Sequence, residues 1–196
     1  MSDFGAKRRR RVRASVPTST ANIGLGFDVF SVALERPRID VEFEPAPSGT
    51  RKIVVQGEYA AKVNIDPHMH PAGKALFALA AESGEPGGYV LRISSDLSPG
   101  KGLGVSGAVA VGAVFCANQS LGLRLDGLSL VNIAAKAEPE HHMDNACASA
   151  FGGFNIVART PMEGSGAITV IPPPKDLGLA ILVPDIENLL RRKPAN

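Results

Sequence analysis

The chain has 196 residues, of which 44% are hydrophobic and 20% charged, and its formal net charge is +2. This length and composition are typical of a globular protein with one large domain or two small ones, and no apolar run is long enough to cross a bilayer. With 5% aromatic residues and no Trp, the chain also lacks the basic and aromatic surface expected of a nucleic-acid-binding protein.

The chain opens on a basic run that no apolar segment follows. Residues 7–13 hold six Lys or Arg side chains, and we expect residues 1–10 to form a solvated, flexible tail. The run lacks the apolar core of a signal peptide, and Cys116 and Cys147 form no CxxC pair. These features predict a cytoplasmic protein without a disulfide scaffold or a zinc site.

Hydrophobic patterning along the chain predicts strands and helices in a mixed order. Alternating apolar and charged residues at 38–45, for example, are typical of a half-buried strand. We expect strands at 11–16, 38–45, 51–58, 88–96, 151–158, 167–174 and 177–185, and helices at 71–82, 105–121 and 127–138. A turn-rich loop is expected from residue 17 to an apolar run at 27–34. Because strands and helices do not alternate strictly, the pattern favours an α+β fold over a doubly wound parallel sheet.

The stretch SPGKGLGVSGA at 98–108 crowds four glycines in front of a predicted helix. Glycine disfavours regular structure, so the stretch predicts positive φ angles or a ligand that approaches bare backbone. Free N–H groups at the start of the helix would favour an anion such as a phosphate. A P-loop is excluded because Lys101 precedes Gly102 and no Gly-Lys-Ser/Thr follows.

Two further interpretations of this loop stay open at the level of the residues. Residues 102–107 match the dinucleotide pattern GxGxxG literally, although a polar segment separates them from the preceding strand. A tight turn leading into a small-residue helix that packs on a sheet would need no ligand.

Three stretches in a fixed order resemble the motifs of one family. SPGKGLGVSGA at 98–108 resembles the phosphate loop P-x-x-x-G-L-G-S-S-A of the GHMP kinases, which include galactokinase, homoserine kinase and mevalonate kinase. VPTSTANIGLGFDVFSVAL at 16–34 resembles the opening of the homoserine kinases, and HHMDNACASAFGGFNIV at 141–157 resembles their H-x-D-N segment. By these motifs the chain is identified as a member of this superfamily, most similar to homoserine kinase.

The resemblance implies a fold and a reaction. It implies an α+β N-terminal ATP-binding domain over 11–160, of a fold also found in a ribosomal protein, and over 161–196 the start of a ferredoxin-like C-terminal domain that is mostly missing. It implies ATP and Mg²⁺ as cofactors and phosphorylation of the L-homoserine hydroxyl to O-phospho-L-homoserine for threonine biosynthesis. A homodimer is compatible with it.

The resemblance also assigns nucleotide and metal sites. The implied nucleotide loop consists of Ser98, Pro99, Gly100, Lys101, Gly102, Leu103, Gly104, Val105, Ser106, Gly107 and Ala108. Ser106 matches a serine that helps to hold Mg²⁺ and the phosphates, and a glutamate from the next helix completes the metal site in the family. We favour Glu138, which ends the predicted helix, over Glu140, which follows Pro139. An exposed carboxylate without a ligand is the alternative for Glu138.

The acceptor side is implied in the same way. Asp144 and Asn145 match the pair beside the reacting hydroxyl and are the expected catalytic residues. Asn22, Asp28, His142 and Asn145 match residues that contact the amino-acid substrate. Asn22 in an ordinary turn and His142 as a hydrogen-bonded structural residue are the alternatives.

The sequence departs from the family pattern at several points. Val105 replaces the first serine of the phosphate loop, Gly107 replaces a small residue, and His70 stands where relatives often carry Asn. The third glycine-rich motif of the superfamily is not found. Another small-molecule GHMP kinase and a truncated nucleotide-binding protein without catalysis are therefore the alternative functions.

Overall fold

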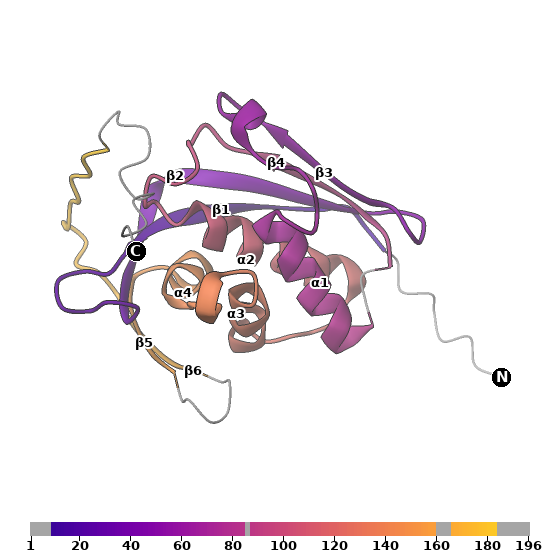
Figure 1. Ribbon diagram of the computed structural model, residues 1–196. Coiled ribbons are helices and arrows are strands. Elements are labelled where there is room, and N and C mark those ends of the chain that lie inside the picture. Colours follow the sequence, from indigo (N-terminus) through magenta and orange to yellow (C-terminus); the bar gives the residue numbers. More distant parts are fainter. Residues whose placement is uncertain (1–8, 85–86, 160–165, 184–196) are drawn as a thin grey trace, which may run out of the picture.

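The computed structural model describes residues 9–84, 87–159 and 166–183, which form one mixed sheet covered by helices (Figure 1). The strands are β1 (Val12–Ala21), β2 (Phe30–Pro45), β3 (Arg51–Gln56), β4 (Tyr89–Ser94), β5 (Phe154–Arg159) and β6 (Gly166–Ile171). The sheet order is β3-β4-β2-β5-β6, and β1 pairs with β2. Only β3 and β4 run parallel among the described pairs, and the others are antiparallel.

The helices gather on one face of the sheet (Figure 1). The helices on this face are α1 (Pro71–Ser83), α2 (Val105–Leu121), α3 (Gly127–Ala135) and α4 (Asp144–Phe151). Two short 3-10 turns, η1 (Ala60–Lys62) and η2 (Pro139–His141), lie in the connections between elements. The expected α+β class is confirmed.

Helix α2 lies at the centre of the core and packs on β1 and β2 as well as on the other three helices. Its small residues allow this close approach. A Cβ atom added at Gly112 would lie 2.7 Å from Val41 Cγ2 and 3.0 Å from Val16 Cγ2, so the helix backbone rests almost directly on the sheet. This packing fixes the position of the N-terminus of α2, where the glycine loop ends.

Local capping interactions mark the starts of α1 and α3 and the end of α2. His70 caps α1 by accepting a hydrogen bond from the N–H of Ala72 at 3.1 Å, and Asp126 caps α3 through the N–H of Ser129 at 2.8 Å. Gly122 ends α2 with a φ of +66°, as the glycine predicted. Helix α3 stops at residue 135, three residues earlier than expected, because the backbone turns before η2.

Strand pairing overrides the turn signals between residues 17 and 34. The expected loop from residue 17 is part of β1, since Ser19, Thr20 and Ala21 pair with Ala33, Val32 and Ser31 after a register shift. The apolar run at 27–34 and the strand at 38–45 merge into β2, with residues 27–29 left in the turn before it. The expected loop was wrong for residues 17–21 and is confirmed for residues 22–26, because pairing with β2 satisfies backbone groups that Ser and Thr would otherwise bind locally.

Later elements differ in a similar way. Helix α4 was not expected, because DNACASAF is too short to show a helical apolar stripe, and the following strand begins at 154 rather than 151. Residues 177–183 form no strand, and residues 184 and 185 of that expectation lie outside the described residues.

The sheet continues past the expected domain boundary at residue 160. β6 pairs with β5 in an antiparallel register from Phe154–Ile171 to Arg159–Gly166. Residues 1–8 of the expected tail lie outside the described part of the chain. Within the described residues, no helix has both the length and the apolar composition needed to cross a membrane.

Candidate functional site

The glycine loop before α2 adopts the left-handed backbone that its composition predicts. Gly100, Gly102 and Gly104 have φ angles of +79°, +73° and +59°. A Cβ atom on Gly100 or Gly102 would meet nothing within 4 Å, whereas one on Gly104 would lie 2.1 Å from Ser19 Oγ. Conformation therefore demands the first two glycines, and both conformation and packing demand Gly104.

The N-terminus of α2 carries no side-chain cap. Gly104 is the N-cap residue and has no side chain that could accept from the N–H groups of the first turn. The positive end of the helix dipole therefore faces the loop. Gly107 and Ala108, which the sequence placed in the nucleotide loop, are buried inside α2. An uncapped helix start behind a left-handed glycine loop has the chemistry of a phosphate-binding site.

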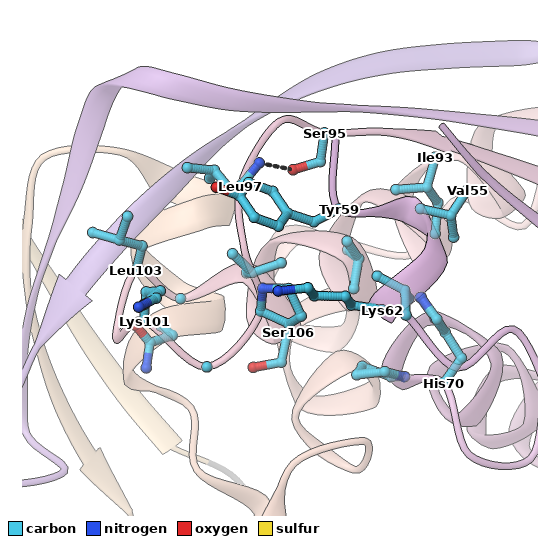
Figure 2. A pocket seen from close by; sticks show the side chains of 18 of the residues that line it. Val55, Tyr59, Lys62, His70, Ile93, Ser95, Leu97, Lys101, Leu103 and Ser106 are labelled. Carbon is cyan, nitrogen blue, oxygen red and sulfur yellow. Dashed lines mark hydrogen bonds between the residues drawn. The ribbon is translucent and has the colours of Figure 1, made fainter. Parts of the chain in front are cut away.

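The loop forms one wall of a cavity of about 500 Å³ (Figure 2). Residues 99–106 of the expected nucleotide loop line this cavity, and Ser98, Gly107 and Ala108 do not. Asn22 and Asn145 also line it, so residues of all three sequence motifs meet at one cavity.

The opposite wall is apolar and was missed at the level of the sequence. It is lined by Val55, Tyr59, Val63, Met69, Ile93 and Leu97. Figure 2 shows Lys62 of η1 extending across the cavity, while Lys101 lies in the glycine loop. An apolar wall facing an amide-rich one, with one lysine from each wall, suits a ligand with a flat apolar end and a negatively charged end. The run YAAKVN at 59–64 has no pattern that announces this role.

His70 lies at the edge of the same cavity as a neutral cap. The residue is 4% exposed, and burial lowers its pKa from 6.5 to about 4. Since its ring nitrogen accepts the N–H of Ala72, the neutral imidazole is the form that the fold needs.

Glu138 and Ser106 lie close together, as the sequence anticipated for a metal site. Burial raises the pKa of Glu138, the nearby charge of Asp144 raises it further, and the Ser106 hydroxyl opposes this shift. Glu138 Oε1 is buried without a hydrogen-bond partner. By contrast, the side chain of Glu140 is 86% exposed, which favours Glu138 of the two candidates.

The Asp144–Asn145 pair begins α4 beside this carboxylate. Asp144 is 2% exposed, and burial raises its pKa, although its Oδ1 accepts the N–H of Asn145 at 2.8 Å. The Ser31 hydroxyl donates to the backbone carbonyl of Asp144 at 2.6 Å and ties the helix start to β2. Of the pair, Asn145 lines the cavity and Asp144 does not.

Three of the four predicted substrate residues, Asn22, Asp28 and His142, contact one another, whereas Asn145 contacts Ser19 and Asp144. The N–H of Asp28 donates to Asn22 Oδ1 at 2.7 Å, and His142 Nδ1 lies 3.2 Å from Asp28 Oδ1. Asn22 and Asp28 have φ angles of +61° and +56°, which Asn and Asp tolerate better than most residues. His142 Nε2 is also 3.5 Å from Glu140 Oε2, so two carboxylates flank the imidazole.

The described residues contain no group of three or more His, Cys, Asp or Glu side chains that could hold a metal ion by themselves. This arrangement is compatible with Mg²⁺, which commonly takes one or two protein groups and completes its shell with phosphate oxygens and water.

Comparison with known proteins places these features in a family context. Residues 71–153 match the family described as GHMP kinases N terminal domain. Homoserine kinase of Halobacterium salinarum (strain ATCC 29341) is 34% identical over 178 residues, which are 89% of this chain and 54% of that protein. Homoserine kinase of Methanococcus vannielii is 28% identical over 183 residues, or 91% of this chain and 59% of that protein. The chain thus spans less than two thirds of the length of these relatives.

Solved structures support the fold. The crystal structure of homoserine kinase from Cytophaga hutchinsonii matches with a TM-score of 0.71 and 22% identity, covering 87% of this chain and 54% of that one. A structure of MDDEF in complex with MVAPP, AMPPCP and magnesium matches with a TM-score of 0.56 and 18% identity, covering 83% of this chain and 50% of that one. At these identities the likeness concerns the fold alone.

Proposed function

The chain carries the N-terminal domain of the GHMP kinases, and from this premise we propose that it transfers the γ-phosphate of ATP to the hydroxyl of L-homoserine. The observation that carries the proposal is the meeting of two sites. Asn22 and Asn145 line the cavity of the glycine loop, and Asn22 is hydrogen-bonded to Asp28, which contacts His142. A phosphate donor and an amino-acid acceptor would therefore lie side by side.

ATP fits the two unlike walls of the cavity. The phosphates would lie against the amides of the glycine loop and the uncapped start of α2, near the cations of Lys62 and Lys101. The adenine would lie against the apolar wall around Val55, Tyr59 and Leu97.

Mg²⁺ fits Ser106 and Glu138, because a hydroxyl and a carboxylate are hard oxygen ligands. Glu138 Oε1 lacks a partner in a buried position, and a cation would supply one. When bound there, Mg²⁺ would neutralise negative charge on the transferring phosphoryl group.

The acceptor would bind through the opposite cluster. Asp28 would pair with the ammonium group of the amino acid, with His142 and Asn22 holding Asp28 in place. The hydroxyl oxygen forms a bond to the γ-phosphorus, the bond to the leaving ADP oxygen breaks, and the hydroxyl proton is released. Asn145 would contact the reacting groups from the cavity wall, with the buried Asp144 beside it. Positioning and charge supply most of the catalysis in such transfers.

The test is ATP-dependent phosphorylation of L-homoserine by the purified 196-residue chain with Mg²⁺, together with ATP binding by calorimetry. We expect turnover with homoserine in preference to mevalonate or galactose, and loss of turnover in Ser106→Ala and Glu138→Gln. Glu140→Gln is the matched variant and should retain the Mg²⁺ dependence of ATP binding. Binding without turnover would leave a nucleotide-binding protein, and preference for another alcohol would assign a different kinase.

A further inference from the structure

Ser19 is a fully buried residue of β1 that joins three parts of the site. Its hydroxyl donates to Asn145 Oδ1 at 2.9 Å, and it lies 3.4 Å from the backbone carbonyl of Asn145. Its N–H donates to the carbonyl of Leu103 in the glycine loop at 3.2 Å. One residue thus links β1, the loop before α2 and the first turn of α4.

The packing around Ser19 leaves little freedom for these contacts. A Cβ atom on Gly104 would lie 2.1 Å from Ser19 Oγ and 2.7 Å from Asn145 Oδ1, so the loop backbone presses on the hydrogen bond. The pairing of β1 with β2 shifts register between Pro17 and Ser19, so Ser19 and its neighbour Thr18 have different surroundings. Thr18 is equally buried, but its hydroxyl donates to the carbonyl of Pro37 at 2.8 Å rather than to a residue of the site.

The two ends of an Asn side chain have opposite hydrogen-bonding character. Oδ1 only accepts and Nδ2 only donates, so an amide that turns over presents the wrong group to its ligand. Because the Ser19 hydroxyl donates to Oδ1, that end of Asn145 is held toward β1. Nδ2 lies 3.4 Å from Asp144 Oδ1, a long contact that leaves its donor capacity largely unused.

We propose that Ser19 is a positioning residue, which fixes the Asn145 amide so that its NH₂ end is the donor offered to the transferring phosphoryl group. This role rests on the proposed kinase function. Ser19 does not touch the reacting groups itself, and it also couples the orientation of Asn145 to the position of the glycine loop through Leu103. Ser19 thereby influences both the position of the loop that would bind the phosphates and the orientation of the Asn145 NH₂ donor.

The first experiment observes the amide directly. The Asn145 side-chain NH₂ signals are assigned in a ¹⁵N spectrum through Asn145→Asp and compared in wild type, Ser19→Ala and Thr18→Val. We expect Ser19→Ala to shift the signals or split them into two sets, and Thr18→Val, which removes a matched buried hydroxyl, to leave them in place. Ser19→Cys retains a weaker donor on a slightly larger side chain and should give a smaller shift, which keeps the test available if Ser19→Ala does not fold.

The second experiment measures homoserine phosphorylation. Ser19→Ala should lower kcat about two- to tenfold, the range of one hydrogen bond, while KM for ATP and homoserine changes less than about twofold. In an Asn145→Ala background the same substitution should have no further effect on kcat. An equal loss in that background, or unchanged NH₂ signals, would overturn the role of Ser19. Absence of turnover in the wild type would refute the kinase function instead, and the amide spectra would still decide for or against the positioning role.

Discussion

Gly104→Ala tests the geometry of the glycine loop, with Gly100→Ala as its matched control. Both glycines have positive φ angles, +59° and +79°. They differ in surroundings, because a Cβ atom at 104 would meet Ser19 Oγ and Asn145 Oδ1, whereas one at 100 would meet nothing within 4 Å. The pair therefore separates backbone strain from steric conflict.

The expected magnitudes follow from these two terms. A left-handed conformation costs a non-glycine residue about 1–2 kcal/mol, so Gly100→Ala should lower the free energy of unfolding by about that amount. The contact at 2.1 Å forces Ser19 or the loop to move, and overpacking of this kind costs about 1–3 kcal/mol more. Gly104→Ala should therefore cost about 2–5 kcal/mol in total, by adding the two ranges.

The assay is urea unfolding of the nucleotide-free chain, followed by circular dichroism, for the wild type and both variants. We expect Gly104→Ala to be at least 1 kcal/mol less stable than Gly100→Ala, with the lower end set by the overpacking range of about 1–3 kcal/mol. Its Asn145 amide signals should also move, while those of Gly100→Ala should not. Equal losses of stability in the two variants would refute the argument that Gly104 is packed against Ser19 and Asn145.

Three further predictions concern titratable groups. Because the pKa of His70 falls to about 4 in the folded state, the unfolded chain binds the proton first as the pH drops below 6.5, and stability is lost between pH 6.5 and 4. By urea unfolding, wild type should lose about 3 kcal/mol more than His70→Asn over this window, since Asn keeps the cap without titrating, and parallel curves would contradict the neutral cap. Burial raises the pKa of Glu138, so ionisation of this carboxyl destabilises the fold as the pH rises above the ordinary pKa of a glutamate. In the absence of Mg²⁺ and ATP, Glu138→Gln should therefore have a higher melting temperature than wild type at pH 7. A lower melting temperature would argue against an uncompensated carboxylate. Burial raises the pKa of Cys116 and Cys147 to about 12, so neither thiol should react with a disulfide reagent at pH 8 until urea is added, and rapid reaction of the native chain would contradict their burial.

Much of the helical structure follows from local chemistry and was predictable. Pro71 and Gly84 bracket α1, and Gly104 and Gly122 bracket α2, because caps and left-handed ends depend on residues a few positions away. The positive φ angles of the loop follow from its glycines for the same reason. The class of the fold was also predictable, since the order of strands and helices is visible along the chain.

Parts of the site depend on contacts that no local pattern contains. The apolar wall at Tyr59 and Leu97 comes from segments separated by almost forty residues, and neither segment has a motif. Helix α4 was hidden because its eight residues are too few for an apolar stripe, and its position rests on Ser31 and Ser19 of the neighbouring strands. The contact between Asp28 and His142 likewise joins residues far apart in sequence.

The sequence by itself determined the ends of α1 and α2, the left-handed glycine loop and the family to which its three motifs point, because each depends on short runs of residue types. Only the tertiary structure decided that β1 continues through Ser19 and that this residue meets Gly104 and Asn145. Serine favours turns when its backbone has no other partner, and the pairing of β1 with β2 supplies that partner from across the fold. The hydroxyl is thereby left to reach the site rather than its own backbone.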